Sequence, residues 1–326
     1  MPSKRTYLRA AMYACACLIA PASWAQANAY PNKPIRLIVP FAAGGPADVV
    51  ARQVAVSLGQ ELGQSVVIEN MGGGAGVPAL SSVSRSATDG YTLLFAASGN
   101  VVIQPLLAKK PVDVLTQLAP VGMVTTSPHV LVVTSKLPAQ TLKEFTSYAK
   151  ANPGAVNFAY AGVGGLAHLA TELFMRAADV DVRHVPYKGS SQAMADLASG
   201  QVQAMFSSLP SMKGMVDKGA IRVLGVTSAS ASSAYKGLPV IKQAGVPGFE
   251  YTTWYGIYGP VGLAPGVVQR LGGAMAKLAS NKSLEESLGA LGVELQISNA
   301  AELANRTRKE SAQWSKVIRE ARIELN

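Results

Sequence analysis

The sequence has few cysteines, histidines and charged residues for its length. Of its 326 residues two are cysteines, both within the first 17 positions, three are histidines and 15% are charged. So little charge excludes a coiled coil and a charge-rich disordered chain, and 31 glycines without a regular period exclude collagen. Hydrophobic residues make up 49%, so the chain can build a sizeable core, and its length is enough for two ordinary domains.

The first 29 residues have the pattern of a secretory signal peptide. An apolar stretch over residues 10–20 is followed by small residues at 25–29 and preceded by the basic residues Lys4, Arg5 and Arg9. The stretch is shorter than the roughly 20 residues that span a bilayer. We expect export to remove it together with Cys15 and Cys17, which leaves no thiol, disulfide or cysteine metal ligand. Export without disulfides indicates a bacterial periplasm, and a lipid anchor on Cys17 is a less favoured alternative.

The mature chain is basic. Removing the three basic residues of the signal peptide lowers the formal charge from +10 to +7, which favours anionic partners. The other basic residues are scattered singly or in pairs such as Lys109-Lys110, without an aromatic-rich basic motif. We therefore expect a solvated basic surface and no nucleic-acid partner.

Short runs rich in β-branched residues alternate with segments of helical spacing. Apolar residues recur every four positions from Val50 to Leu62, and Thr141 with Glu144 forms a capping box for a helix that begins at Leu142. Strands alternating with helices are typical of an α/β fold with parallel strands and crossover helices. The pattern predicts strands at 35–39, 66–69, 91–96, 156–159, 182–185, 204–206 and 221–227.

No flexible linker divides the chain, although its length exceeds what one core usually holds. Two extended stretches, His129 to Thr134 and Thr253 to Gly259, are candidate crossings between two lobes. Two crossings make the first lobe discontinuous, with helices between residues 265 and 323 closing it. The domain prediction is therefore a lobe 1 formed by residues 30–128 and 254–326 and a lobe 2 formed by residues 129–253.

Glycine-rich turns that follow strands are the candidate ligand sites. The first, Phe41 to Gly45, leads from a strand into a helix, so its backbone N–H groups and the helix start can hold an anion without a cationic side chain. A plain tight turn explains the same residues equally well. Asp48, in the first turn of that helix, is better explained as a helix stabiliser than as a ligand contact.

Similar turns follow other strands. Met71 to Gly76 is either a ligand loop or a connector, and in the turn at 97–100 Ser98 and Asn100 offer neutral hydrogen bonds. Gly162 to Ala167 matches the dinucleotide pattern G-x-G-x-x-A. The next strand, however, ends in residues 186–189 (PYKG) rather than in the acid that would hold a ribose, so dinucleotide binding is not expected.

The sequence lacks recognisable catalytic and metal-binding motifs. It has no G-x-S-x-G element, and no two of its three histidines, His129, His168 and His184, have a short metal-ligand spacing. His168 lies in the first turn of a helix, where it either contacts a ligand or packs at the helix start. Turns rich in glycine and hydroxyl groups, with Ser207 ending another strand, indicate a site that holds a ligand without converting it.

Several motifs occur in a fixed order along the chain. Residues 30–41 read YPNKPIRLIVPF and are followed by Gly44-Gly45 and Asp48. The further motifs are DGYTLL at 89–94, YAGVGGLAH at 160–168, ELF at 172–174, VPYKG at 185–189 and GQV at 200–202. This combination of motifs, which extends over essentially the whole mature chain, resembles the Bug-type periplasmic receptors, the solute-binding subunits of tripartite tricarboxylate transporters.

The resemblance implies a two-lobed periplasmic-binding-protein (Venus-flytrap) fold of the α/β class, each lobe a mixed, mainly parallel sheet flanked by helices. It implies a monomeric receptor, without enzymatic activity, cofactor or metal, that closes on a small organic anion and delivers it to membrane permease subunits. In this family the loop after the first strand meets a ligand carboxylate largely through water. The ligand-binding residues implied are Phe41, Ala42, Ala43, Gly44, Gly45, Ala97, Ser98, Asn100, Gly162, Val163, Gly164, Gly165, His168, Tyr187, Lys188, Gly189 and Ser207.

Two departures from the family pattern bear on the ligand. Ser207 stands where many members have an aspartate, and Gly165 stands where a serine is common. Both make the site less polar, so a dicarboxylate or an aromatic carboxylate is favoured over an amino acid. A sensory receptor that presents its closed form to a membrane kinase would have the same site. A periplasmic enzyme that uses Ser98 or Ser207 with His168 is a more distant alternative.

Overall fold

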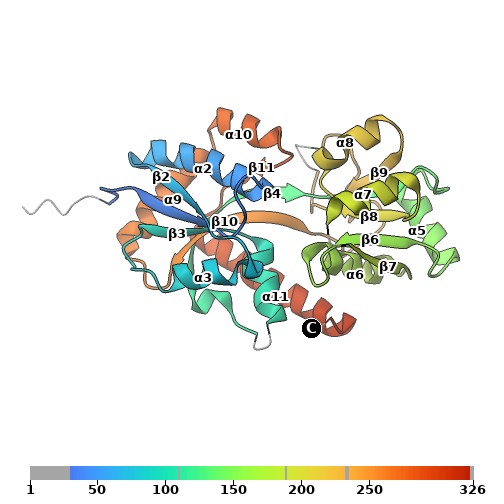
Figure 1. The fold of residues 1–326 in the computed structure, drawn as a ribbon, viewed down its shortest axis with the longest axis horizontal. Coiled ribbons are helices and arrows are strands. Elements are labelled where there is room, and N and C mark those ends of the chain that lie inside the picture. The colour runs from blue at the N-terminus through green and yellow to red at the C-terminus, as the bar shows by residue number, and fades with distance from the viewer. Residues whose placement is uncertain (1–29, 109–110, 188, 232–234, 324–326) are drawn as a thin grey trace, which may run out of the picture.

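The computed structural model describes residues 30–323 apart from 109–110, 188 and 232–234 (Figure 1). The predicted signal peptide, Lys188 and the Lys109-Lys110 pair lie outside the described residues. Figure 1 shows two α/β halves side by side, with β4 and β10 running between them.

The first half is built on a six-stranded sheet in the order β11-β4-β10-β3-β1-β2. Parallel pairing is confined to β2, β1 and β3, whereas β10 runs antiparallel to both β3 and β4, and β11 antiparallel to β4. The strands are β1 (Ile35–Val39), β2 (Val66–Asn70), β3 (Thr92–Ala97), β4 (Leu118–Pro128), β10 (Thr252–Pro260) and β11 (Glu294–Leu295).

The second half is built on a five-stranded sheet in the order β7-β6-β8-β5-β9. Here β7, β6 and β8 are parallel, and β5 runs antiparallel to β8 and β9. The strands are β5 (Val130–Thr134), β6 (Asn157–Ala161), β7 (Arg183–Tyr187), β8 (Ala204–Ser207) and β9 (Ile221–Val226). Both sheets are therefore mixed, with the parallel strands grouped away from the crossings.

Helices flank both sheets. Helix α2 shows how the sequence specifies them: Pro46 begins it, Val54 and Leu58 on its apolar stripe are buried, and Gly63 ends it with a φ of +72° that favours glycine. The helices of the first half are α2 (Pro46–Leu62), α3 (Val77–Ser84), α4 (Gln104–Leu107), α9 (Pro265–Leu278), α10 (Lys282–Gly289) and α11 (Ala300–Ala321), with short turns η1 (Gly74–Gly76), η2 (Gly99–Ile103) and η3 (Val114–Thr116). Those of the second half are α5 (Leu142–Ala151), α6 (Leu166–Ala178), α7 (Ser190–Ser199) and α8 (Leu209–Asp217).

The chain crosses between the halves at two neighbouring places. Only His129 separates β4 of the first sheet from β5 of the second, and Tyr251 precedes β10 on the way back. Both crossings are hydrogen-bonded to Thr227: Tyr251 N–H donates to its carbonyl, and His129 N–H donates to its hydroxyl. The β4-β10 ladder begins at the Pro128–Thr252 pair, so both crossings lie at one hinge.

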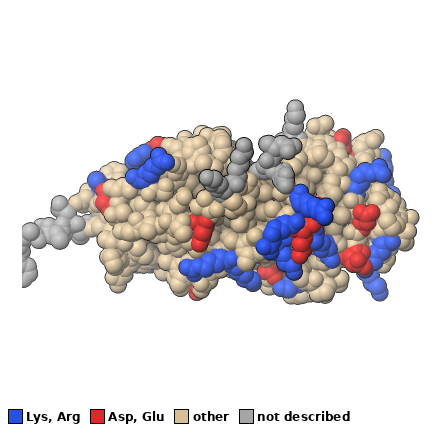
Figure 2. Space-filling model, turned by 90° about the horizontal axis from the view of Figure 1, so that it is seen from below, with Lys and Arg blue, Asp and Glu red and all other residues tan. Residues whose placement is uncertain are grey.

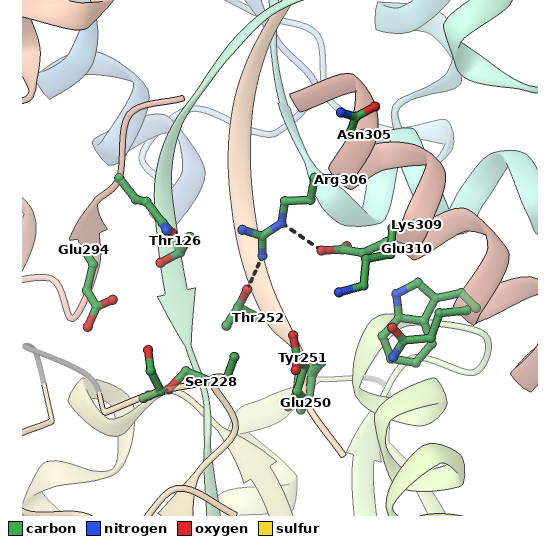
Figure 3. A pocket seen from close by; sticks show the side chains of 15 residues that line it. Thr126, Ser228, Glu250, Tyr251, Thr252, Glu294, Asn305, Arg306, Lys309 and Glu310 are labelled. Atoms are coloured by element: carbon green, nitrogen blue, oxygen red, sulfur yellow. Dashed lines mark hydrogen bonds and ion pairs between the residues drawn. The ribbon is translucent and has the colours of Figure 1, made fainter. Parts of the chain in front are cut away.

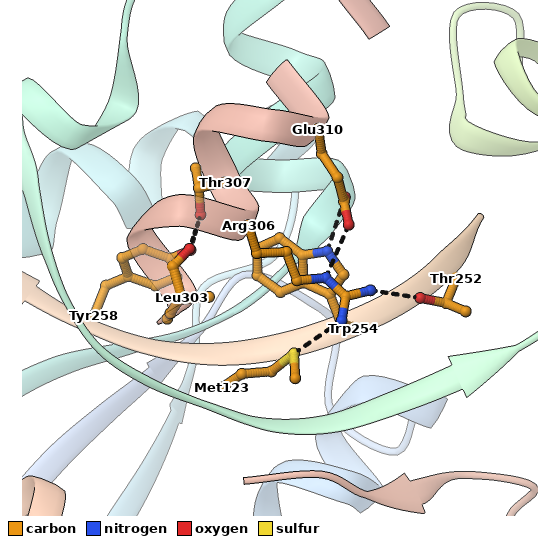
Figure 4. A network of polar contacts seen from close by, with 8 residues as sticks. All are labelled: Met123, Thr252, Trp254, Tyr258, Leu303, Arg306, Thr307 and Glu310. Carbon is orange, nitrogen blue, oxygen red and sulfur yellow. Dashed lines mark hydrogen bonds and ion pairs between the residues drawn. The ribbon is translucent and has the colours of Figure 1, made fainter. Parts of the chain in front are cut away.

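Helix α11 packs across the strand that returns to the first half. Arg306 donates to the carboxylate of Glu310 (2.9 Å) and to the hydroxyl of Thr252 (2.7 Å), and the indole N–H of Trp254 donates to Glu310 (2.8 Å) (Figure 4). One turn away from Leu303, Thr307 lies 3.0 Å from the hydroxyl of the buried Tyr258. These bonds fix α11 on β10 next to the hinge.

The largest apolar core is continuous through both halves. It joins Leu94, Trp254 and Leu303 of the first half to Phe158 and Phe206 of the second. Phe206 and Phe158 have ring centroids 5.2 Å apart, inside an aromatic cluster that burial stabilises. Residues far apart in the sequence therefore share one core at the junction of the halves.

The sequence located most strands correctly but missed β4 and the two-residue strand β11. The predicted strands agree with β1, β2, β3, β6, β7, β8 and β9 to within one or two residues at most ends. Pro120 and Gly122 interrupt the apolar run of β4, and for that reason its periodicity is not visible. The helix from Leu142 is confirmed, and the Thr141 side chain caps it, although Glu144 accepts from the N–H of Gln140 rather than that of Thr141.

Charged side chains are interspersed on the surface. Figure 2 shows a face on which Lys and Arg lie beside Asp and Glu over one half, while large areas carry neither sign. Several of these groups pair, as Arg176 does with Glu320 at 2.8 Å. On this face both signs of charge are interspersed, as on a solvated protein surface.

Candidate functional site

Three loops of the first half meet at one edge of its sheet. Because β2, β1 and β3 are parallel neighbours, residues 41–45, 71–76 and 98–100 all follow strand ends on the same side. Met71 N–H donates to the carbonyl of Val39 (2.8 Å), and a Cβ added to Gly72 would lie 3.0 Å from the backbone nitrogen of Ala42. The loops are therefore in contact with each other.

The carboxylate of Asp48 fixes the loop at 41–45. Asp48 is 2% exposed and accepts hydrogen bonds from Gly44 N–H (2.8 Å), Arg52 Nε (2.9 Å) and Asn70 Nδ2 (2.9 Å). The bond from Arg52 contributes most to lowering the pKa of Asp48 to about 2, against the opposing effect of burial. Asp48 is thus an ionised residue that holds the loop, which agrees with the helix-stabilising role predicted for it.

The turn after β3 presents one satisfied and one unsatisfied polar side chain. Asn100 donates to the carbonyl of Ala75 (3.1 Å) and accepts from the N–H of Ala97 (3.3 Å), so its amide links two loops of the first half. Ser98 is 2% exposed, and its Oγ has no hydrogen-bond partner among the described residues. A buried hydroxyl without a partner is costly, so Ser98 is suited to meet a ligand or water.

Three loops of the second half meet in the same way. The parallel strands β6, β7 and β8 end at Ala161, Tyr187 and Ser207, and residues 162–165 follow the first of them. Gly162 N–H donates to the carbonyl of Tyr187 (3.0 Å), which joins two of these loops directly. The edge of this sheet therefore carries the second group of predicted site residues.

The strand directions make the two groups of loops face each other. Strand β4 runs out of the first sheet into β5 of the second, and β8, antiparallel to β5, runs back toward the first sheet together with β6 and β7. In the same way β10 runs from the second half into the first, and β3, antiparallel to it, points with β1 and β2 toward the second half. The carboxyl ends of both parallel groups consequently point across the junction (Figure 1).

Two predicted contacts in the second half are already used within the chain. Tyr187 donates its hydroxyl to Asp196 (2.7 Å), and burial together with this bond raises the pKa of Tyr187 to about 12. His168 accepts a hydrogen bond from Gly164 N–H at Nδ1 (3.1 Å). Ser207 is 8% exposed, and Gly162 and Val163 are exposed.

The structure brings together His168, Glu172 and His184, a cluster that the sequence analysis missed. Their potential ligand atoms lie within 4.8 Å of one another, and Nε2 of His184 is 3.1 Å from Oε1 of Glu172. The i,i+4 spacing of His168 and Glu172 on a helix was the available signal, since it places both on one face. The cluster does not suit a metal, because a histidine ligand normally donates its second ring nitrogen, whereas Nδ1 of His168 accepts from Gly164.

A cavity of about 410 Å³ lies beside the hinge. Figure 3 shows Arg306 reaching from α11 toward Thr252, with Thr126 and Glu294 on the opposite side and Ser228 below. Its lining comes from both halves of the chain, including Tyr251 at the return crossing. No motif in the sequence indicated it, because its residues come from five separate segments.

Comparisons with known proteins agree with this architecture. The model of the tripartite tricarboxylate transporter family receptor matches residues 50–323. BugT of Bordetella pertussis is 35% identical over 314 residues, which cover 96% of this chain and 95% of BugT. Among solved structures, R. palustris Rpa4515 with adipate has a TM-score of 0.74 and 33% identity, covering 90% of this chain and 99% of its own. MatC from Rhodopseudomonas palustris with bound malate has a TM-score of 0.70 and 28% identity, covering 89% of this chain and 100% of its own.

The fold and the two facing groups of loops define a two-lobed solute-binding protein. The chain belongs to the receptor family of the tripartite tricarboxylate transporters, which includes the Bug proteins. Its relatives are binding proteins rather than enzymes, and a neighbour in structure, BugD, is a periplasmic binding protein. Throughout the described part of the chain, no helix combines the length and apolar character needed to cross a bilayer.

Proposed function

We propose that this receptor captures a small dicarboxylate between its two halves and delivers it to a membrane permease. Relatives that are 33% and 28% identical contain adipate and malate, both dicarboxylates, and this supports the choice of ligand over an aromatic carboxylate or an amino acid. The mechanism is a population shift: the ligand binds across the junction and stabilises a closed form that the permease recognises. No covalent step is needed.

Unused backbone donors at the facing loops are the observation that carries the proposal. Among the described residues, the N–H groups of Ala42, Ala43 and Val163 donate no hydrogen bond, whereas those of Gly44 and Gly164 are used within the chain. Ala42 and Ala43 lie just before α2, and Val163 lies just before α6. Free backbone N–H groups in glycine-rich turns that lead into helices can bind a carboxylate without a lysine or arginine. Free N–H groups on both halves suit a ligand with two carboxylates.

The remaining parts of the proposal concern the context of the site. Lobe 1 would comprise residues 30–128 and 254–326 and lobe 2 residues 129–253, and residues 1–29 would direct export to the periplasm. The receptor would act as a monomer. Lys188, which follows Tyr187 in the sequence, is proposed to contribute a positive charge to the site, and Ser98 and Ser207 are proposed to contribute neutral hydrogen bonds.

A thermal-shift screen tests the ligand class. The purified protein, unfolded and refolded to remove any bound solute, would be heated with adipate, malate, aromatic carboxylates and amino acids. A dicarboxylate at 100 times its dissociation constant should add about 2.7 kcal/mol to the free energy of unfolding and raise Tm. Stabilisation by amino acids alone would overturn the proposed ligand class.

A charge placed in the loop of the first half gives a sharper test. Ala43→Asp puts a carboxylate at an exposed position beside the free N–H groups, and we expect it to weaken adipate or malate binding at least tenfold through repulsion. Val56→Asp is the matched control, because Val56 is 64% exposed on the outer face of α2. This substitution adds the same charge away from the loops. Equal dicarboxylate affinity in the two variants would contradict the proposed site.

A further inference from the structure

The loop at 162–165 is held by a side chain that can gain a proton. Gly164 N–H donates to Nδ1 of His168 (3.1 Å) in a buried hydrogen bond. An N–H donor requires a lone pair on Nδ1, so the imidazole is neutral and carries its proton on Nε2. Gly164 has a φ of +73°, a left-handed conformation that favours glycine at this position of the turn.

His168 is itself firmly placed. Its ring stacks on Tyr160 of β6 with centroids 4.4 Å apart and an interplanar angle of 16°, and the ring of His184 on β7 meets it edge-on at 5.5 Å. Glu172, one turn along α6, binds His184 at 3.1 Å. The imidazole therefore connects α6 and two strands to a single backbone N–H of the loop.

We propose that His168 is a positioning residue whose neutral form fixes the 162–165 loop for ligand binding and whose protonation releases it. A proton on Nδ1 removes the acceptor and places two N–H groups against each other, so Gly164 must turn away. Val163, whose free N–H is proposed to meet the ligand, lies in the same turn. The consequence for the ligand rests on the proposed function, whereas the hydrogen bond itself does not.

Burial, more than the surrounding charges, favours the neutral form of His168 near neutral pH. Burial is the main cause that lowers the pKa of His168, the nearby His184 lowers it further, and Glu172 opposes both. Tyr160 stays a neutral phenol because burial raises its pKa, and Arg176 pairs with Glu320 of α11. Strand β8 contributes no titratable group, since it reads AMFS. The hydrogen bond from Gly164 to His168 is therefore present at pH values above the ordinary pKa of histidine. It is lost as the pH falls through the lowered pKa of His168.

Two substitutions separate the effect of a hydrogen-bond acceptor at position 168 from the effect of its protonation. In His168→Asn the amide oxygen lies near the position of Nδ1 and can accept from Gly164 without titrating. His168→Leu keeps the volume but removes the acceptor. We expect His168→Leu to weaken adipate binding about five- to tenfold at every pH, as for the loss of one buried hydrogen bond, and His168→Asn to recover most of that loss.

The pH profile of adipate affinity from pH 7.5 to 5.0 supplies the first readout. Dividing the wild-type affinity by the His168→Asn affinity at each pH cancels the effect of the protonation of adipate itself. This ratio should fall as the pH decreases. His184→Gln keeps His168 and should retain the acid dependence. A ratio that does not change with pH, or an acid dependence that disappears only in His184→Gln, would overturn the proposal.

The amide resonance of Gly164 in the ligand-free protein supplies a readout that does not depend on ligand identity. Its proton shift should titrate with the same midpoint as the ring protons of His168 and stay constant in His168→Asn. A Gly164 resonance indifferent to the ionisation of His168 would refute the positioning role. If Gly164 follows His168 while adipate and malate fail to bind, the positioning role stands and the proposed ligand class alone is wrong.

Discussion

Asp48 shows how much of the site depends on one buried carboxylate. It joins the loop at 41–45, helix α2 and strand β2 through Gly44, Arg52 and Asn70. The sequence predicted its place in the first helical turn, but not its bonds to Gly44 and Asn70. Those bonds depend on the pairing of β1 with β2, which a local pattern does not encode.

Asp48→Asn tests this role. The amide cannot accept three hydrogen bonds and leaves a buried donor facing another donor, so we expect a loss of about 2 kcal/mol in the free energy of unfolding. Urea denaturation measures it. Asp217→Asn, which removes an exposed i,i+4 partner of Lys213, should change the free energy by less than about 0.5 kcal/mol. Equal effects of the two substitutions would contradict the account.

The pH dependence of stability follows from two residues whose pKa values are lowered. Burial lowers the pKa of His129 at the hinge from 6.5 to about 4, and Asp48 is lowered from 3.8 to about 2. The unfolded chain binds more protons in both ranges, so the free energy of unfolding should fall by about 1 to 3 kcal/mol from pH 6.5 to 4 and again from pH 3.8 to 2. Urea titrations at pH 7, 4 and 2 measure the two decreases separately. Constant stability over this range would refute both, and Asp48→Asn should lack the second decrease.

At the scale of elements, the attachment of α11 to β10 depends on Glu310. Burial raises the pKa of Glu310, yet its carboxylate accepts from both Arg306 and Trp254 (Figure 4). Removing a partner from such a group leaves the others unpaired in a largely buried place.

Glu310→Ala should therefore lower the free energy of unfolding by about 2 to 3 kcal/mol. Glu320→Ala is the control on the same helix, because the pair of Glu320 with Arg176 is 42% and 37% exposed and should contribute less than about 1 kcal/mol. Thermal or urea unfolding compares the two variants. A Glu310→Ala protein as stable as Glu320→Ala would show that the network does not hold α11.

Elements with a clear local pattern could be predicted, and elements defined by distant partners could not. The stripe of α2 and the cap of α5 are visible in the sequence because the spacing of their own residues specifies them. Strand β4 was missed, since its eleven residues are identified as a strand by pairing with β10 and β11, which lie far away in the sequence. The cluster of His168, Glu172 and His184 was missed for the same reason: His184 reaches it only through the position of β7 beside β6.

At the scale of the whole molecule, the two crossings position the site. They orient both groups of parallel strands so that their carboxyl ends face each other, and they place a cavity lined by both halves next to the hinge (Figure 3). Rotation about this hinge would change the distance between the loops without altering either sheet. This geometry explains how a chain without catalytic motifs can still respond to a ligand.

Isothermal titration of the refolded protein with adipate and malate, followed by chemical analysis of the ligand, shows whether the protein binds a dicarboxylate without converting it. At least one of the two dicarboxylates should bind in a one-to-one complex and be recovered unchanged, and Ala43→Asp should weaken this binding at least tenfold while Val56→Asp keeps the wild-type affinity. Absence of binding by both dicarboxylates, or conversion of the bound ligand to a product, would contradict a receptor that captures a dicarboxylate between its halves.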